Sequence, residues 1–191
     1  MSVHSKSCTT PAGELKYRMA GAEGGLPLVF VHGAAGDSRQ FHYQLEYFGG
    51  KRTVAAVDLP GHGRSTMKGL PSMTDYVDAV AAVLEAESME RCVLAGHSMG
   101  GGIILETYDR VPEKIAGLVF LSTGATLPVS DLVFDFLDKD FKVFCEFLVK
   151  LSYSRALPEE VRQMVLKEAQ SLDTALVRND FRICAAFDYT D

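Results

Sequence analysis

The stretch VLAGHSMGGGI, residues 93–103, joins an apolar strand pattern to a helical pattern through a Gly-x-Ser-x-Gly sequence. A strand that turns this sharply into a helix leaves the Ser98 hydroxyl exposed at the turn. A side chain at Gly96 or Gly100 would collide with the neighbouring backbone, and the serine itself takes a strained conformation. The same five-residue pattern also occurs in ordinary surface loops, so its meaning depends on the rest of the chain.

The composition is that of a globular protein with one sizeable core. The chain has 191 residues, 47% of them hydrophobic and 23% charged, with a net charge of −6. An acidic balance without a Lys/Arg run argues against nucleic acid or an anionic membrane as a partner. No run approaches the roughly 18 consecutive apolar residues of a membrane helix, and the polar N-terminus lacks the apolar segment of a signal peptide.

The cysteines indicate the compartment. None of them has CxxC spacing, and all lie in or beside apolar runs: Cys8, Cys92, Cys145 and Cys184. Such residues are typical of buried, reduced thiols, so we expect a cytoplasmic protein.

Apolar runs that alternate with helical patterns predict an α/β fold. A hairpin is expected first, from residues 3–8 and 14–19, around the turn at Pro11. The expected buried strands are 28–31, 53–57, 92–95 and 115–121, and the expected helices are 38–47, one capped by Thr74, and 101–110. This order predicts a mostly parallel, doubly wound sheet with right-handed crossovers and helices on both faces.

The pattern changes to helices alone from Ser130 onward. Apolar residues recur at helical spacing over 132–148, a second helix is expected from Pro158, and a third from about Thr174. We therefore predict a division into a core, residues 1–125, and a helical cap or lid, residues 126–191. The alternative is a helical subdomain that takes no part in substrate binding.

Three motifs stand at the ends of successive predicted strands: HGAAG at 32–36, DLPGHGRS at 58–65 and GHSMGG at 96–101. Together they closely resemble the α/β-hydrolase superfamily, in particular its esterase-like members with a helical cap. The resemblance is strong from Leu26 to Thr123 and loose over the helical remainder. It implies the α/β-hydrolase type of sheet, with the third motif as the nucleophile elbow.

The resemblance assigns roles to particular residues. Ser98 would be the nucleophile, and the backbone N–H groups of Met99 and Ala34 would bind the oxyanion. No cofactor and no metal are implied. Expected substrate contacts are Gly33 and His97, with the cap residues Phe134, Phe141 and Phe144 as further candidates. For His97 and the three phenylalanines, packing is the alternative role.

Other polar residues near these motifs have structural readings. His32 is expected to order the oxyanion loop, because the family has a structural histidine there. His62 lies in a Gly-rich turn held by Arg64 and Ser65. Asp58 follows an earlier strand than the one the family uses for its catalytic acid, so we expect it to be structural as well.

The histidine of the expected triad is missing. The family order is nucleophile, acid, histidine, yet all five histidines precede Ser98. We therefore expect a truncated hydrolase that lacks the last two strands, with their acid and base. The strand 115–121 would then be an open apolar edge, which predicts a homo-oligomer or pairing with a missing C-terminal segment.

The sequence thus favours a serine hydrolase that cleaves an ester or related acyl bond of a small molecule through an acyl-enzyme. Within this chain alone the reaction would be weak or absent. Two alternatives remain open. One is another activity of the same fold, namely a C–C bond hydrolase, a thioesterase or a perhydrolase. The other is a non-catalytic binding protein that keeps the elbow.

Overall fold

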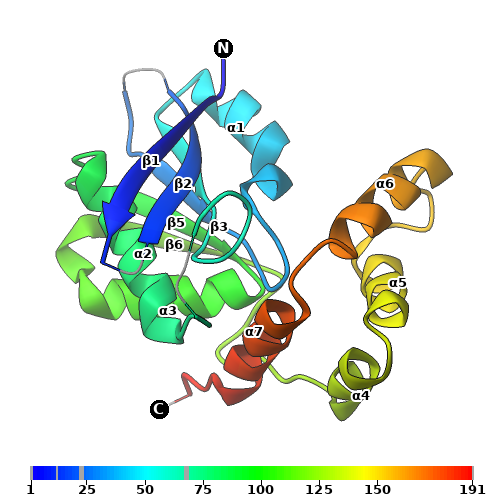
Figure 1. Ribbon diagram of the computed structural model, residues 1–191. Coiled ribbons are helices and arrows are strands. Elements are labelled where there is room, and N and C mark those ends of the chain that lie inside the picture. Colours follow the sequence, from blue (N-terminus) through cyan, green and yellow to red (C-terminus); the bar gives the residue numbers. More distant parts are fainter. Residues whose placement is uncertain (1, 12, 22–23, 67–68, 191) are drawn as a thin grey trace.

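The computed structural model describes residues 2–11, 13–21, 24–66 and 69–190. They form a six-stranded sheet with the order β1-β2-β4-β3-β5-β6 (Figure 1). The strands are β1 His4–Thr10, β2 Gly13–Ala20, β3 Leu28–Val31, β4 Val54–Val57, β5 Cys92–His97 and β6 Ile115–Leu121. β1 and β2 pair antiparallel, β2 joins β4 antiparallel, and the remaining pairs are parallel. The expected hairpin and mostly parallel sheet are confirmed.

The register of the central strands places the three sequence motifs together. Val31, the last residue of β3, pairs with Val57 of β4 and with Gly96 of β5. Val31 and Val57 are each followed directly by a motif, at His32 and Asp58, and Gly96 is itself the first residue of the third motif. Since the strands run parallel, the loops that carry the motifs meet at the same edge of the sheet.

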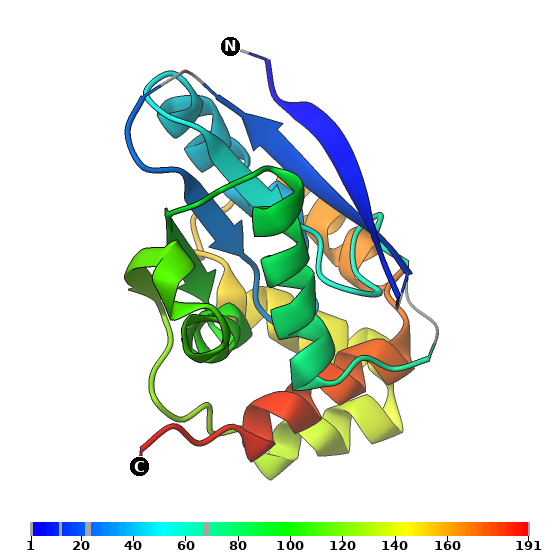
Figure 2. The ribbon, with the colours of Figure 1, turned by 90° about the vertical axis from the view of Figure 1, so that its left-hand side faces the viewer.

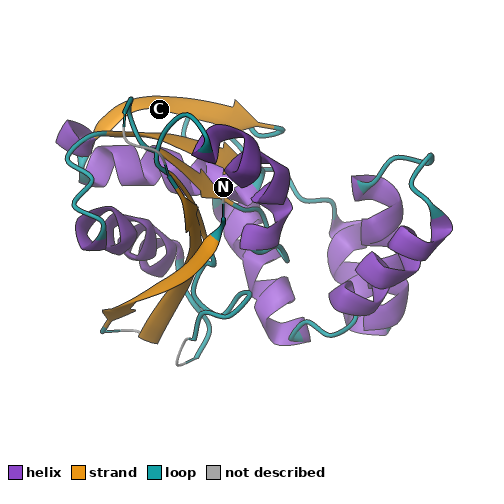
Figure 3. Ribbon diagram, turned by 90° about the horizontal axis from the view of Figure 1, so that it is seen from above, coloured by secondary structure: helices purple, strands orange, loops and turns teal. Residues whose placement is uncertain are grey.

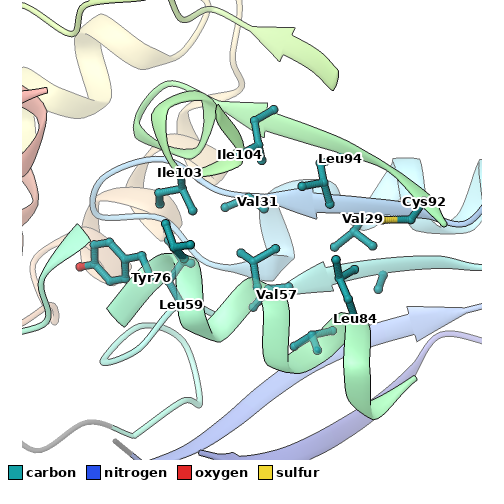
Figure 4. Close-up of a cluster of buried hydrophobic side chains, with 14 of the residues drawn as sticks. Val29, Val31, Val57, Leu59, Tyr76, Leu84, Cys92, Leu94, Ile103 and Ile104 are labelled. Atoms are coloured by element: carbon teal, nitrogen blue, oxygen red, sulfur yellow. The ribbon is translucent and has the colours of Figure 1, made fainter. Parts of the chain in front are cut away.

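Helices cover both faces of the sheet, as Figure 3 shows. They are α1 His42–Gly49, after a 3-10 turn at Ser38–Phe41, α2 Met73–Ala86 and α3 Met99–Arg110. Because neighbouring strand residues point to opposite faces, Val29 and Val31 pack with α2 and α3 in one cluster, drawn in Figure 4. Leu28 and Phe30 pack with α1 in another cluster.

The remaining helices follow the last strand without another strand between them. They are α4 Asp131–Lys139, α5 Phe141–Ser152, α6 Glu159–Ala169 and α7 Thr174–Ala186. Leu137, Phe144, Cys145 and Val177 form a separate small cluster there. α7 runs alongside α4 and also reaches α3 of the core (Figure 2). The division into a core and a functional cap stays a prediction.

Some helix boundaries differ from the sequence expectations. Four helices follow the sheet instead of three, because the extended Asp140 interrupts the pattern and its carboxylate caps α5. Ser72 caps α2 instead of Thr74, since Ser72 and Asp75 bind each other's backbone N–H in a capping box. α3 begins at Met99, two residues before the expected start.

All four cysteines are free, and three of them are buried. Among the described residues, no helix has both the length and the apolar character needed to cross a membrane.

Candidate active site

Ser98 stands alone between the end of β5 and the start of α3. Its backbone angles are φ 51° and ψ −119°, in a region that non-glycine residues rarely adopt. Hydrogen bonds hold it there: its N–H donates to the carbonyl of Leu121 at 3.0 Å, and its carbonyl accepts from Gly101 N at 2.8 Å. The hydroxyl of Thr123 also donates to that carbonyl, at 2.8 Å. The strained conformation is therefore fixed by its neighbours on β6 and α3.

The two glycines of the elbow lie where no side chain fits. A Cβ atom at Gly96 would lie 2.2 Å from the carbonyl oxygen of Gly100. A Cβ atom at Gly100 would lie 2.3 Å from the carbonyl oxygen of Val31, on the neighbouring strand. Both contacts are with backbone that is itself buried, so the steric reason given by the sequence for these glycines is confirmed.

The loop after β3 packs directly against the elbow. A Cβ atom at Gly33 would lie 3.0 Å from the Cβ atom of Ser98 and 3.1 Å from Nδ1 of His97. Ala34 follows Gly33, so its backbone N–H belongs to the segment that touches the nucleophile. Within the described part of the chain, neither Ala34 N–H nor Met99 N–H has a hydrogen-bond acceptor. Two unpaired amides in the segments that adjoin Ser98 suit the binding of an oxyanion, which stays a prediction for both.

His32 links two of the motif loops. It is fully buried; its Nδ1 donates to the Gly33 carbonyl at 2.8 Å, and its Nε2 accepts from Leu59 N–H at 3.1 Å. Burial, together with the nearby His62, lowers the pKa of His32 to about 4. A neutral ring with both nitrogens engaged orders the loop, as expected, and is not available as a base.

His97 and Asp58 have different surroundings. The Nδ1 atom of His97 is buried without a hydrogen-bond partner among the described residues, and burial lowers the pKa of its ring. Asp58 accepts from Ser38 N at 2.7 Å and from Arg64 N at 3.1 Å, and its own carbonyl accepts from the Ser65 hydroxyl. These bonds tie the second motif to the loop after β3, which is the structural role expected for Asp58.

The cap phenylalanines lie at different depths. Phe144 is 1% exposed inside the helical cluster. Its ring stacks on that of Phe141, with the two ring centroids 6.0 Å apart, and meets the ring of Phe181 edge-on. Phe134 is half-buried, with the guanidinium of Arg178 over its ring. Substrate contact by Phe134, Phe141 and Phe144 stays a prediction.

Sequence reasoning missed Asp180, which lies on α7 and is 0% exposed. Its carboxylate accepts hydrogen bonds from Tyr76, His62 and the backbone of Ala35. One signal was present: Asp180 comes four residues after Leu176 and three before Ile183, on the apolar face of the predicted helix. A carboxylate on such a face must find partners elsewhere in the fold.

A cavity of about 430 Å³ lies away from the nucleophile. It is lined by the β1–β2 hairpin and by loop residues that include Asp37, Asp58 and Arg64. Ser98 is not among its lining residues. The geometry of the elbow, and not this cavity, therefore defines the candidate site.

Comparisons with known proteins agree with this geometry. The chain is 36% identical over 112 residues to the dihydrolipoyllysine-residue acetyltransferase component of the acetoin cleaving system of Pseudomonas putida, covering 58% of this chain and 30% of that protein. It is 32% identical over 121 residues to a serine hydrolase-like protein of Danio rerio, covering 62% and 37%. These alignments span about a third of the length of either relative.

A similar fold is found in the solved structure of a thermophilic esterase. That structure superposes with a TM-score of 0.82 over 98% of this chain and 70% of the esterase, at 23% identity. The family model described as the alpha/beta hydrolase family matches residues 28–187. Since this match covers most of the chain, the protein belongs to the alpha/beta hydrolase family.

Proposed function

We propose that the chain carries the nucleophile and oxyanion donors of a serine hydrolase that cleaves an ester bond of a small molecule. The observation that carries the proposal is the Ser98 backbone, strained at φ 51° between β5 and α3. The Gly33 loop lies against the Cβ atom of the same residue. The relatedness to a serine hydrolase-like protein supports a hydroxyl nucleophile.

The proposed reaction proceeds in two steps. The Ser98 oxygen attacks the ester carbonyl while its proton passes to water, and the carbonyl oxygen becomes an oxyanion bound by Met99 N–H and Ala34 N–H. Collapse of this intermediate breaks the ester C–O bond; the leaving oxygen takes up a proton from water and departs as the alcohol, while the acyl group stays on Ser98. Water then attacks the acyl-enzyme, releases the carboxylic acid and restores the serine.

The rate of the reaction in this chain depends on which group accepts the Ser98 proton. Both ring nitrogens of His32 are engaged in hydrogen bonds. The same holds for His62, which binds Pro60 and Asp180. No histidine follows Ser98. An elbow with oxyanion donors but without its base retains about 10³ to 10⁴-fold of rate enhancement over water in related triads. We expect weak turnover of this order.

A fluorophosphonate probe tests the proposal. The probe is incubated with the chain, and the labelled peptide is identified by mass spectrometry. We expect slow labelling at Ser98 that Ser98→Ala abolishes. Ser122 supplies a matched control, because it is an exposed serine that also has a positive φ, of 49°; Ser122→Ala should leave labelling unchanged. Labelling that persists in Ser98→Ala contradicts the proposal, and a complete lack of labelling favours a non-catalytic binding protein.

A second variant separates the backbone of Met99 from its side chain. Met99 is fully buried, so Met99→Ala should cost about 2 to 5 kcal/mol of unfolding free energy. Its N–H remains in place, and the labelling rate of the folded protein should stay within about threefold of the native rate. Loss of labelling in a folded Met99→Ala protein would exclude the proposed backbone role.

A further inference from the structure

Asp180 is a carboxylate that lies wholly inside the protein and joins three separate segments. The Tyr76 hydroxyl, on α2, donates to Oδ1 at 2.5 Å. His62, in the loop after β4, meets Oδ2 through Nε2 at 2.8 Å, and Ala35 N–H, in the loop after β3, donates to Oδ2 at 3.0 Å. Since Asp180 itself belongs to α7, helix α7 is tied through one side chain to the two motif loops and to α2.

Both ring nitrogens of His62 face hydrogen-bond acceptors. Nδ1 faces the Pro60 carbonyl at 3.1 Å and Nε2 faces the Asp180 carboxylate. A carbonyl and an ionised carboxylate can only accept, so these two contacts favour the form of the ring that carries protons on both nitrogens. Burial alone lowers the pKa of His62, and the hydrogen bond and charge of Asp180 raise it above its usual value. The contact between His62 and Asp180 is buried on both sides, and buried hydrogen bonds of this kind hold their geometry tightly.

Ala35 connects Asp180 to the loop that carries the proposed oxyanion donor, because its N–H donates to the Asp180 carboxylate. Its φ of 56° lies in the left-handed region, which disfavours residues with a Cβ atom. Its side chain packs against the helical cluster that contains Phe144 and Val177. Its N–H belongs to the peptide group that joins it to Ala34, so the bond to Asp180 fixes that peptide plane. The preceding backbone N–H, that of Ala34, is one of the two that we assign to the oxyanion.

α7 is also packed against the second motif loop, independently of Asp180. A Cβ atom at Gly61 would lie 3.2 Å from Cδ1 of Leu176, on the same helix. Asn179, next to Asp180, donates from its side chain to the Pro71 carbonyl at 2.7 Å. Helix α7 therefore contacts neighbouring loops through Leu176 and Asn179, which precede Asp180 in the helix. These contacts hold Asp180 beside Ala35.

We propose that Asp180 is a positioning residue for the oxyanion site: by binding Ala35 N–H, it sets the orientation of Ala34 N–H toward Ser98. The inference rests on the proposed function of Ser98. In this arrangement a helix outside the sheet, α7, completes the geometry of a loop on the sheet. Displacement of α7 would leave the nucleophile in place and misdirect one oxyanion donor.

Three variants of the 191-residue chain separate positioning from general stability. Asp180→Ala removes every acceptor. Asp180→Asn keeps one oxygen for Ala35 N–H, and its amide can donate to the Tyr76 oxygen. Tyr76→Phe breaks the hydrogen bond to Oδ1 and weakens the same buried cluster, but leaves the bond to Ala35 intact.

Two readouts are measured on each folded variant. The first is the ¹H–¹⁵N signal of Ala35 and its rate of hydrogen exchange. The second is the affinity of phenylboronic acid, followed by ¹¹B NMR, because its adduct with Ser98 places an anionic oxygen in the oxyanion site. We expect Asp180→Ala to speed Ala35 exchange and to weaken phenylboronic acid binding about tenfold or more. Asp180→Asn should rescue both readouts, and Tyr76→Phe should keep the binding within about twofold of native.

Several results would overturn the inference. One is an Ala35 signal that does not change in folded Asp180→Ala; another is an equal loss of boronate affinity in Asp180→Ala and Tyr76→Phe. If Asp180→Ala does not fold, the native chain decides, since an Ala35 amide that exchanges at the rate of an unstructured peptide contradicts the contact. If phenylboronic acid does not bind the native chain, the proposed function of Ser98 fails, and the Ala35 signal alone then decides whether Asp180 orders the loop.

Discussion

The sheet with α1–α3 and the helical segment α4–α7 are stabilised in different ways. Every residue of β3 and β4 is buried, and the helices on both faces supply continuous apolar clusters. The helical segment has one small cluster, and α6 has no buried residue. The strained Ser98 and its glycines lie in the first region, where the backbone cannot move aside. The second region reaches the site chiefly through α7, so it can adjust the site without forming it.

The largest effect should come from breaking the packing of the elbow. In Gly100→Val, the new Cβ atom would lie 2.3 Å from the Val31 carbonyl oxygen, and the buried strand β3 cannot shift to make room. We expect a loss of more than about 4 kcal/mol of unfolding free energy, or no folded protein, in urea titrations followed by circular dichroism. Gly117→Ala is the control, because a Cβ atom at Gly117 meets nothing within 4 Å. A natively stable Gly100→Val protein would show that the elbow is more pliable than its geometry suggests.

A deletion inside the helical cluster should have a large but local effect. Phe144→Ala removes a ring that is 1% exposed, which costs about 3 to 5 kcal/mol in a well-packed core. Because the cluster is separate from the sheet, we expect the amides of α4 and α5 to exchange faster while those of β3 and β5 keep their protection. Hydrogen exchange with mass spectrometry measures both. Phe134→Ala, at a half-buried site, should have the smaller effect. Equal loss of protection in the sheet would mean that the two regions unfold as one unit.

The sequence was sufficient where the cause of a structure is local. Ile115–Leu121 and Leu28–Val31 are continuous apolar runs, and the structure has both strands with these bounds. Gly96 and Gly100 could be explained because the turn that needs them lies within a few residues. Local signals also compete: the apolar spacing continues across Asp140, and only the extended backbone there shows that its carboxylate starts a new helix.

The hydrogen-bond partners of Asp180 could not be predicted from the sequence, because they are remote from it along the chain. They lie 104, 118 and 145 residues away along the chain, at Tyr76, His62 and Ala35. No period or motif connects these positions. A carboxylate on an apolar helix face indicates that it has hydrogen-bond partners elsewhere in the fold. Only the tertiary packing of α7 against the motif loops identifies them.

Lowering the pH from 7 to 5 should reduce the unfolding free energy, because it protonates the buried ring of His32 in the loop after β3. The pKa of His32 is lowered from an ordinary 6.5 to about 4, so its contribution to stability is present above pH 6.5 and is lost as the pH falls toward 4. Between pH 7 and pH 5 this amounts to about 2 kcal/mol. The raised pKa of His62 acts in the opposite direction, since its contribution is present below pH 6.5 and is lost as the pH rises through its higher value. Urea unfolding of native and His32→Gln proteins at both pH values measures the difference, and a similar acid loss in both would exclude His32 as the cause.

The smallest effect on stability is expected at the edge of the sheet formed by β6. Val119 and Phe120 are 41% and 48% exposed. As neighbours they point to opposite faces, so this end of β6 is uncovered on both sides. At the other edge, β1 is polar and mostly exposed. An apolar strand with free backbone groups is a template for pairing, whereas a polar edge resists it. We propose that two copies of this chain associate through β6.

Val119→Lys tests this association. The substitution places a charge on an exposed edge position, so it should change the unfolding free energy by no more than about 0.5 kcal/mol and shift the chain toward monomer. Light scattering coupled to size-exclusion chromatography measures the mass over a range of concentrations. Ser5→Lys puts the same charge on the β1 edge and should leave the mass of the native assembly unchanged. A native chain that elutes as a monodisperse monomer and unfolds cooperatively would show that the apolar edge is tolerated in solution, and the two edges would then differ in composition only.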